Sequence, residues 1–132
     1  MYSHMVVGVG DFERALRFYA PLMEALGNPL RFVDRGRPWA GWQSPETGRP
    51  LFVIAAPFDG RAPAAGNGHM AAFLARDRAC VREAYRSALA HGGACDGPPG
   101  PRLAYHADYY GAYVRDPDGN KLCVVCHDSD TA

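Results

Sequence analysis

The chain has 132 residues, its 14 basic and 14 acidic side chains balance to a formal net charge of zero, and 48% of its residues are hydrophobic. This size and composition are typical of one globular domain with a substantial core. A neutral chain gives no electrostatic basis for binding nucleic acid or an anionic membrane. No apolar run approaches the ~18 residues of a membrane-spanning helix. Because residues 1–11 lack the basic start and cleavage site of a signal peptide, we expect a cytoplasmic protein whose four cysteines stay reduced.

The first predicted elements occur twice along the chain. His4 and His69 are each followed by Met and a short apolar run, which predicts a strand. Asp11 and Asp77 come next, and each is well placed to cap the N-terminus of a helix by accepting a hydrogen bond from its first turn. We therefore expect the same strand and helix in both halves of the chain.

The two predicted helices carry a single apolar stripe each, which indicates that one side packs on a sheet. Gly27 and Gly92 suit the left-handed position just past a helix end. Pro21 should kink or end the first helix near Ala20, because it cannot donate a backbone hydrogen bond. The stripes consist of Phe12, Ala15, Leu16, Tyr19, Leu22, Met23 and Leu26 in the first helix and Val81, Ala84, Tyr85, Ala88 and Leu89 in the second.

Three strands should follow each helix. Residues 44–48 and 116–120 have hairpin-turn chemistry and lie between apolar runs. A further strand is predicted before each hairpin, at 30–36 and at 102–108, while the Gly- and Pro-rich residues 95–102 predict a loop. We therefore expect one domain over residues 1–132, with module one at 1–58, a linker at 57–68 and module two at 67–132.

Residues 123–127 spell C-x-x-C-H, a spacing that occurs in haem attachment sites and in thiol redox pairs. On a strand that follows a hairpin, Cys123 and Cys126 point to opposite faces with Cα atoms ~10 Å apart. A disulfide needs Cα atoms within ~7 Å, and a thioredoxin-like pair needs the start of a helix. We therefore interpret the motif as a coincidence of spacing, with the two thiols on opposite faces of one strand.

His4 with Asp11, the stretches "RALRFY" and "GHMAAFLARD", and above all "YYGAYVRDPDGNKL" resemble the vicinal oxygen chelate superfamily. This superfamily includes glyoxalase I, extradiol dioxygenases, and fosfomycin- and bleomycin-resistance proteins. The resemblance implies an α+β fold in which two βαβββ modules form an open, curled, mixed β-sheet, or cup, with the helices outside. It also implies a homodimer, since short modules leave sheet edges to be covered.

Many members of the superfamily hold a metal ion in the cup on ligands from the first and last strands of the modules. By position, the resemblance places His4, His69 and Cys123 at three ligand sites, while the fourth falls on Val53 or Ile54. Both carboxylates of the family set are therefore absent. One hypothesis is a divalent metal such as Zn, Fe, Ni or Mn on the two histidines and the thiol. The other is that Cys123 is a small buried hydrophobe.

His106 is the candidate acid or base over the cup, and its alternative is a surface loop histidine. Aromatic and apolar residues on inward strand positions would line a pocket for a small-molecule ligand. We expect this pocket to contain Trp42, Phe52, Ile54, Tyr110 and Tyr113.

Two functions remain open at this point. The chain is either a metal-assisted lyase, isomerase or dioxygenase-type enzyme with a degenerate metal site, or a metal-free small-molecule binding or sequestration protein. A true glyoxalase I is not expected, because the glutamate that transfers the proton in that enzyme is missing. Bleomycin-type binding has little support, since a neutral chain has no surplus of acidic groups for that cationic drug.

Overall fold

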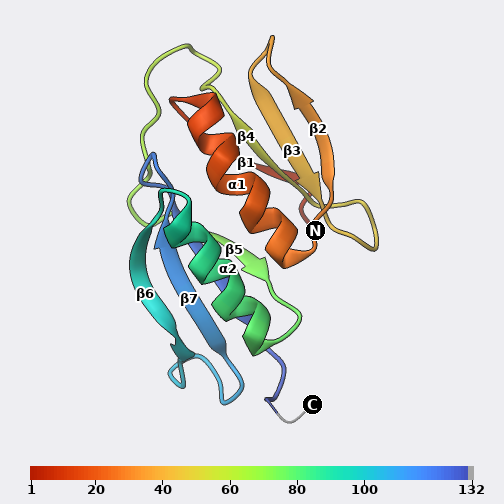
Figure 1. Cartoon of the computed structure of the whole chain (residues 1–132), viewed down its shortest axis with the longest axis vertical. Coiled ribbons are helices and arrows are strands. Elements are labelled where there is room, and N and C mark those ends of the chain that lie inside the picture. The colour runs from red at the N-terminus through yellow and green to blue at the C-terminus, as the bar shows by residue number, and fades with distance from the viewer. Residues whose placement is uncertain (131–132) are drawn as a thin grey trace.

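The computed structural model describes residues 1–130, and its elements follow the order β-α-β-β-β twice (Figure 1). The first module contains β1 (His4–Gly8), α1 (Phe12–Leu26), β2 (Leu30–Asp34), β3 (Trp39–Gln43) and β4 (Leu51–Ala55). The second contains β5 (Ala71–Leu74), α2 (Arg78–Ala90), β6 (Ala94–Pro101), β7 (Tyr110–Arg115) and β8 (Lys121–Cys126). No helix within residues 1–130 is long and apolar enough to cross a membrane.

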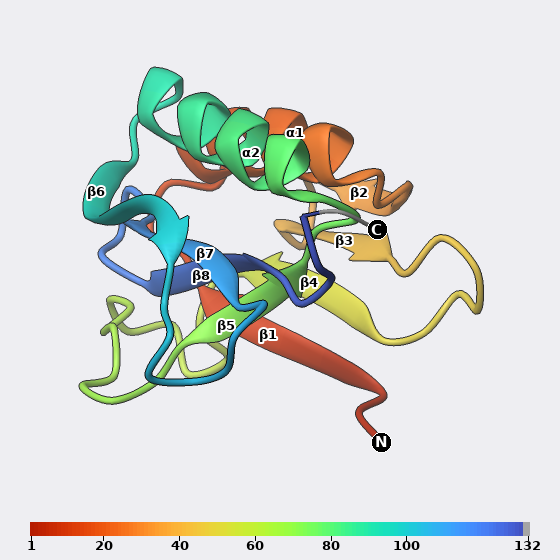
Figure 2. The ribbon, with the colours of Figure 1, turned by 90° about the horizontal axis from the view of Figure 1, so that it is seen from below.

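Each module forms its own four-stranded mixed sheet. The strand orders are β1-β4-β3-β2 and β5-β8-β7-β6, and the first strand of each module pairs in parallel with the last. The helices α1 and α2 lie side by side on one side of the sheets, and β1 and β5 lie next to each other far from the helices (Figure 2). The predicted α+β fold of two βαβββ modules is thus confirmed, with sheets that stay open and do not close into a barrel.

The predicted helix starts are confirmed by the caps. The side chain of Asp11 accepts a hydrogen bond from the backbone of Arg14, and that of Asp77 accepts one from the backbone of Cys80. Gly27 ends α1 with φ of 78°, a left-handed conformation that glycine adopts without strain. Of the two expected effects of Pro21, a helix end does not occur, because α1 continues to Leu26. Burial of the α1 stripe against the sheet stabilises the last turns despite the missing N–H.

The prediction for the segment before the second hairpin was also wrong. The strand β6 occupies Ala94–Pro101, where a loop was expected, and residues 102–108, where a strand was expected, form turns. β6 is the edge strand of its sheet, and its pairing with β7 shifts register at Cys95/Gly97 and Gly97/Gly100. Edge position and bulges accommodate the three prolines, since an edge strand does not need every N–H for pairing.

The two sheet faces differ in what covers them. Residues of the β-strands that point to α1 and α2 form one core with the apolar stripes of the helices. The opposite face, here called the cup face, carries the alternate residues of each strand. Its members include His4, Val6 and Val53 in module one, and Leu74, Tyr113, Cys123 and Val125 in module two.

The hairpin turn of module two is bound to module one. Asp118 accepts hydrogen bonds from the backbone of Gly10 at 2.9 Å and the guanidinium of Arg14 at 3.2 Å. The buried carboxylate of Asp116 accepts one from the hydroxyl of Tyr19 at 2.5 Å. Burial is the main cause that raises the pKa of Tyr19, followed by the neighbouring charge of Asp116. These contacts fix the two modules relative to each other.

Candidate functional site

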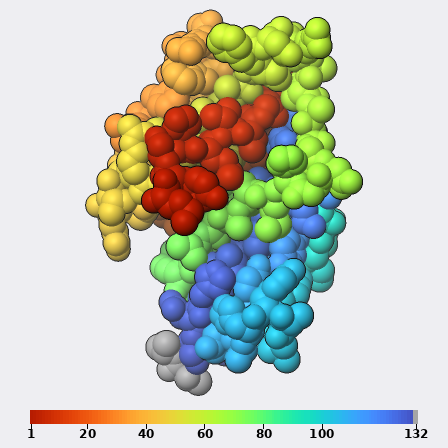
Figure 3. Space-filling model, turned by 180° about the vertical axis from the view of Figure 1, so that it is seen from behind, coloured from red at the N-terminus to blue at the C-terminus, as the bar shows by residue number. Residues whose placement is uncertain are grey.

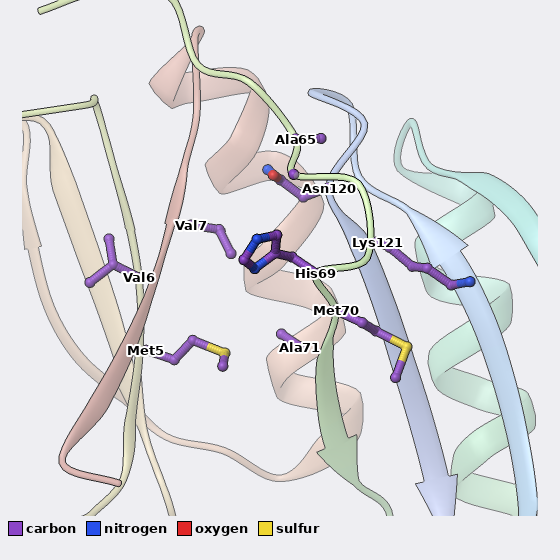
Figure 4. A pocket seen from close by; sticks show the side chains of 10 residues that line it. Met5, Val6, Val7, Ala65, His69, Met70, Ala71, Asn120 and Lys121 are labelled. Atoms are coloured by element: carbon purple, nitrogen blue, oxygen red, sulfur yellow. The ribbon is translucent and has the colours of Figure 1, made fainter.

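A small pocket lies at the seam between β1 and β5 (Figure 4). Its volume is about 130 Å³, and the 65–70 segment of the linker covers one side. His69 lies at its centre, with Met5 and Val7 on the side of β1 and Lys121 on the side of β8. The imidazole packs so closely on Gly66 that a Cβ there would lie 2.2 Å from the ring, so the linker holds His69 in the seam.

The structure does not bring the three expected metal ligands together in one chain. His69 lines the seam pocket, while His4 does not and instead forms a hydrogen bond with the hydroxyl of Ser3 at 2.9 Å. Cys123 is fully buried, and burial raises the pKa of its thiol. The fourth position carries Val53, which shares the cup face with His4, whereas Ile54 points to the helices.

The donor set of a single chain therefore does not fit the metal that the fold family implies. Among residues 1–130, no group of three or more His, Cys, Asp and Glu side chains is placed to hold a metal ion. A protonated thiol is not a metal ligand, and an aliphatic side chain replaces one of the carboxylates.

A string of polar groups runs over Cys123 on the cup face. The hydroxyl of Tyr109 is 2.9 Å from that of Tyr113 and 3.5 Å from the sulfur of Cys123. Burial is the main cause that raises the pKa of both tyrosines. The three groups thus stay protonated at neutral pH, and an O–H or S–H group is a hydrogen-bond donor.

Two cationic side chains flank this string. The ammonium of Lys121 lies 5.4 Å from the ring centroid of Tyr113, and the guanidinium of Arg102 lies 5.6 Å from it. Lys121 also lies 3.7 Å from the carboxylate of Asp96. Hydrogen-bond donors and positive charge therefore predominate around the phenol of Tyr113.

Most of the expected pocket residues lie on the other side of the sheets. Trp42, Phe52 and Ile54 are buried in the core beneath the helices. Tyr110 packs against the same core, and its hydroxyl accepts a hydrogen bond from Arg82 at 3.3 Å. Tyr113 alone of the five lies on the cup face.

His106 forms a close pair with His127, at the end of the cup face beyond Tyr109. The two rings stack, with Nε2 of His106 2.8 Å from Nδ1 of His127. The backbone N–H of Asp108 donates to Nδ1 of His106, so the ring proton of His106 is assigned to Nε2, which donates to Nδ1 of His127. The Nε2 atom of His127 takes no part in the hydrogen bond between the two rings. Both rings stand edge-on to Tyr109.

Sequence reasoning missed Tyr109, Lys121, Arg102 and His127 as members of one cluster. Because side chains alternate along a strand, residues 121, 123, 125 and 127 of β8 and its extension share one face, so the positions of Lys121 and His127 could have been predicted. Arg102 and Tyr109 were not, because Arg102 lies in the 102–108 segment whose strand was wrongly predicted and Tyr109 directly follows it.

The cup face exposes many large apolar side chains. Tyr2, Val6, Leu74, Leu103 and Tyr105 are each more than half exposed. The N-terminal strand and the 102–109 segment, which carry several of them, both lie at the surface seen from behind (Figure 3). Apolar surface gathered in this way is typical of an interface or a ligand-binding face.

The fold and the cup face define a small protein of paired βαβββ modules. A family model described as "Glyoxalase/Bleomycin resistance protein/Dioxygenase superfamily" matches residues 2–124, and the chain belongs to this superfamily. It is 34% identical to a glyoxalase/bleomycin resistance protein from Albidiferax ferrireducens T118, whose crystal structure matches with a TM-score of 0.84 over 96% of this chain and 98% of that chain.

More distant structures show the fold alone. A glyoxalase-related enzyme from Fulvimarina pelagi is 20% identical, with a TM-score of 0.70 over 96% of this chain and 87% of that chain. Lactoylglutathione lyase from Agrobacterium tumefaciens is 18% identical, with a TM-score of 0.63 over 96% of this chain and 92% of that chain. A search of curated proteins gave no significant match.

Proposed function

We propose that this chain binds a small organic molecule on the cup face without a metal, and that the molecule carries a carbonyl or carboxylate oxygen. The observation that supports this most directly is the string of protonated groups formed by Tyr113, Tyr109 and Cys123. Lys121 and Arg102 add positive charge beside it. A face rich in donors and poor in acceptors favours an acceptor oxygen, and the surrounding apolar side chains favour an apolar body.

The protein that binds this molecule is proposed to be a homodimer. The exposed apolar side chains of the cup face would be covered by a second copy. We place the dimer in the cytoplasm, because all four cysteines are free and a reducing compartment keeps them so.

Metal-assisted chemistry is the second candidate. His4 and His69 are both exposed and stand at matching places at the start of the two modules, so a second copy covering the cup face would supply further imidazoles. Metal content therefore has to be measured alongside ligand binding.

The test is isothermal titration of tag-free, EDTA-treated protein with benzoate, benzyl alcohol and benzylammonium. We expect benzoate to bind, and Tyr113→Phe to weaken this binding about ten- to a hundredfold, as loss of one hydrogen bond to a charged group implies. Tyr110→Phe is the matched control, because this tyrosine is on the same strand but points to the helices. Equal affinity of wild type and Tyr113→Phe for benzoate would contradict the proposed site.

Elemental analysis of the same preparation, before chelation, separates the two candidates. We expect no stoichiometric metal in the wild type or in a His4→Ala, His69→Ala variant. Stoichiometric metal that is lost in the variant would support the metal-assisted enzyme and overturn the metal-free proposal.

A further inference from the structure

An apolar groove runs along α1 on the helix side of the first sheet, opposite the cup face. Its volume is about 490 Å³, within the range of small-molecule sites. Trp42 forms part of its wall and is only 3% exposed. Leu16 and Ala20 of α1 lie on one side, and Leu30 and Val33 of β2, the outer strand of the first sheet (Figure 1), lie on the other.

A bulge in β2 shapes this groove. Leu30 pairs with Trp42 and Val33 pairs with Ala40, with a register shift between Leu30 and Phe32. Because of the shift, Leu30 and Val33 both lie on the helix side. In a regular strand, two residues three positions apart point to opposite faces of the sheet. Two apolar side chains thus line the groove where a regular strand would place one.

One end of the groove is negatively charged. It is lined by Glu24, Gly27 and Asn28, at the C-terminus of α1. The carbonyl end of a helix carries partial negative charge, and basic residues in the last turn usually offset it. The last turn of α1 has no basic residue and contains an acid instead. No ion pair found within residues 1–130 includes Glu24.

We propose that this groove is a second ligand site, which binds a small ammonium compound with an aromatic or branched aliphatic body. The apolar body lies against Trp42, Leu16 and Val33, and the ammonium lies at Glu24 and the helix C-terminus. The cation supplies the charge that the last turn of α1 lacks. The groove lies apart from the cup face. It prefers a positively charged ligand, whereas the cup face is proposed to bind a carbonyl or carboxylate oxygen.

The charge of the groove end distinguishes this ligand from a second copy of the chain. The exposed apolar side chains of β1, β5 and the 102–109 segment lie on the opposite face, so a dimer formed there leaves the groove free. A second copy seated in the groove would instead bury Glu24 away from water, which is costly for a carboxylate without a partner.

The test uses the fluorescence of Trp42 in a Trp39→Phe background, titrated with benzylammonium, benzyl alcohol and benzoate. We expect benzylammonium to bind about tenfold more tightly than benzyl alcohol, as a charge-assisted contact implies, and benzoate to bind most weakly. Glu24→Gln should remove the preference for the ammonium and leave the affinity for benzyl alcohol unchanged. Glu46→Gln is the matched control, because this exposed acid in the β3–β4 turn does not line the groove.

A second variant separates binding in the groove from a general effect of charge. Ala20→Phe fills the groove from the exposed side of α1, and we expect it to weaken all three probes while thermal unfolding and circular dichroism stay as in the wild type. Equal affinity for the three probes, or affinity for benzylammonium that neither Glu24→Gln nor Ala20→Phe lowers, would overturn the proposal. Sedimentation that shows Ala20→Phe dissociating a dimer would also overturn it, by assigning the groove to a second copy.

Discussion

Removal of one hydroxyl should measure how strongly the two modules are bound together. Tyr19 of α1 is fully buried and donates a hydrogen bond to Asp116 in the hairpin turn of module two. Tyr19→Phe keeps the ring and its packing, since the ring centroid lies 4.8 Å from that of Phe18 and 5.2 Å from that of Phe52. The variant therefore deletes only the hydrogen bond.

A buried hydrogen bond to a charged group is worth about 1.5–3 kcal/mol. Asp116 keeps its other partners in the variant, since its carboxylate also accepts hydrogen bonds from the backbone of Asp118 and from Asn120. We therefore expect Tyr19→Phe to lower the free energy of unfolding by roughly 2 kcal/mol, which corresponds to a fall in Tm of about 5–10 °C for a chain of this length.

The assay is urea unfolding followed by circular dichroism, with calorimetry for Tm. Asp116→Ala should cost more than Tyr19→Phe, because it leaves the buried hydroxyl and two backbone N–H groups without their acceptor. The double variant should cost less than the sum of the two single variants. Tyr110→Phe, which removes a hydroxyl that accepts a hydrogen bond from the exposed Arg82, is the control and should change stability by under about 0.5 kcal/mol. If Tyr19→Phe is as stable as this control, the hydrogen bond does not hold the modules together.

Three further predictions concern the cup face. The pKa of the Cys123 thiol is raised above its ordinary value of 9.0, so the folded state holds this proton more tightly than the unfolded state does. The free energy of unfolding should therefore fall as pH rises above about 9. In urea titrations, Cys123→Ala should reduce this fall. Long-range 15N–1H spectra at pH 8 should show the Nε2–H tautomer for His106 and His127, and His106→Ala should release His127 into a mixture of tautomers. Val6→Asp with Leu74→Asp should leave circular dichroism unchanged but shift sedimentation from dimer to monomer; a wild type that already sediments as a monomer would contradict this.

The repeated fold was predictable because each of its signals is local. Asp11, Asp77 and Gly27 each act within one turn of their own helix, and the 44–48 and 116–120 turns carry their own Gly and Pro chemistry. β6 was not predictable in this way. Its pairing with β7 depends on two register shifts and on its position at the sheet edge, and neither can be read from a Pro- and Gly-rich stretch.

The candidate site was less accessible than the fold, because its composition depends on strand register. A shift of one residue moves a side chain to the other face of the sheet. Trp42, Phe52 and Ile54 were expected in the cup, and all three lie in the core. Apolar character alone does not distinguish the two faces, because both carry apolar residues in this protein. The polar contacts of Tyr109 needed coordinates, since they join the 102–109 segment to β7 and β8.

The position of His69 connects the seam pocket, the cup face and the dimer. β1 and β5 are neighbours without being paired in one sheet, and His69 is held between them by the linker, while His4 is exposed at the beginning of β1. A single chain therefore provides separated imidazoles, a buried protonated thiol and an aliphatic residue where the family pattern expects four ligands. The tyrosine hydroxyls and Lys121 are already oriented by contacts within module two. Recognition of an acceptor oxygen requires only this preorganised set of donors, whereas metal binding requires a second copy to complete the donor set, and this difference favours the metal-free proposal.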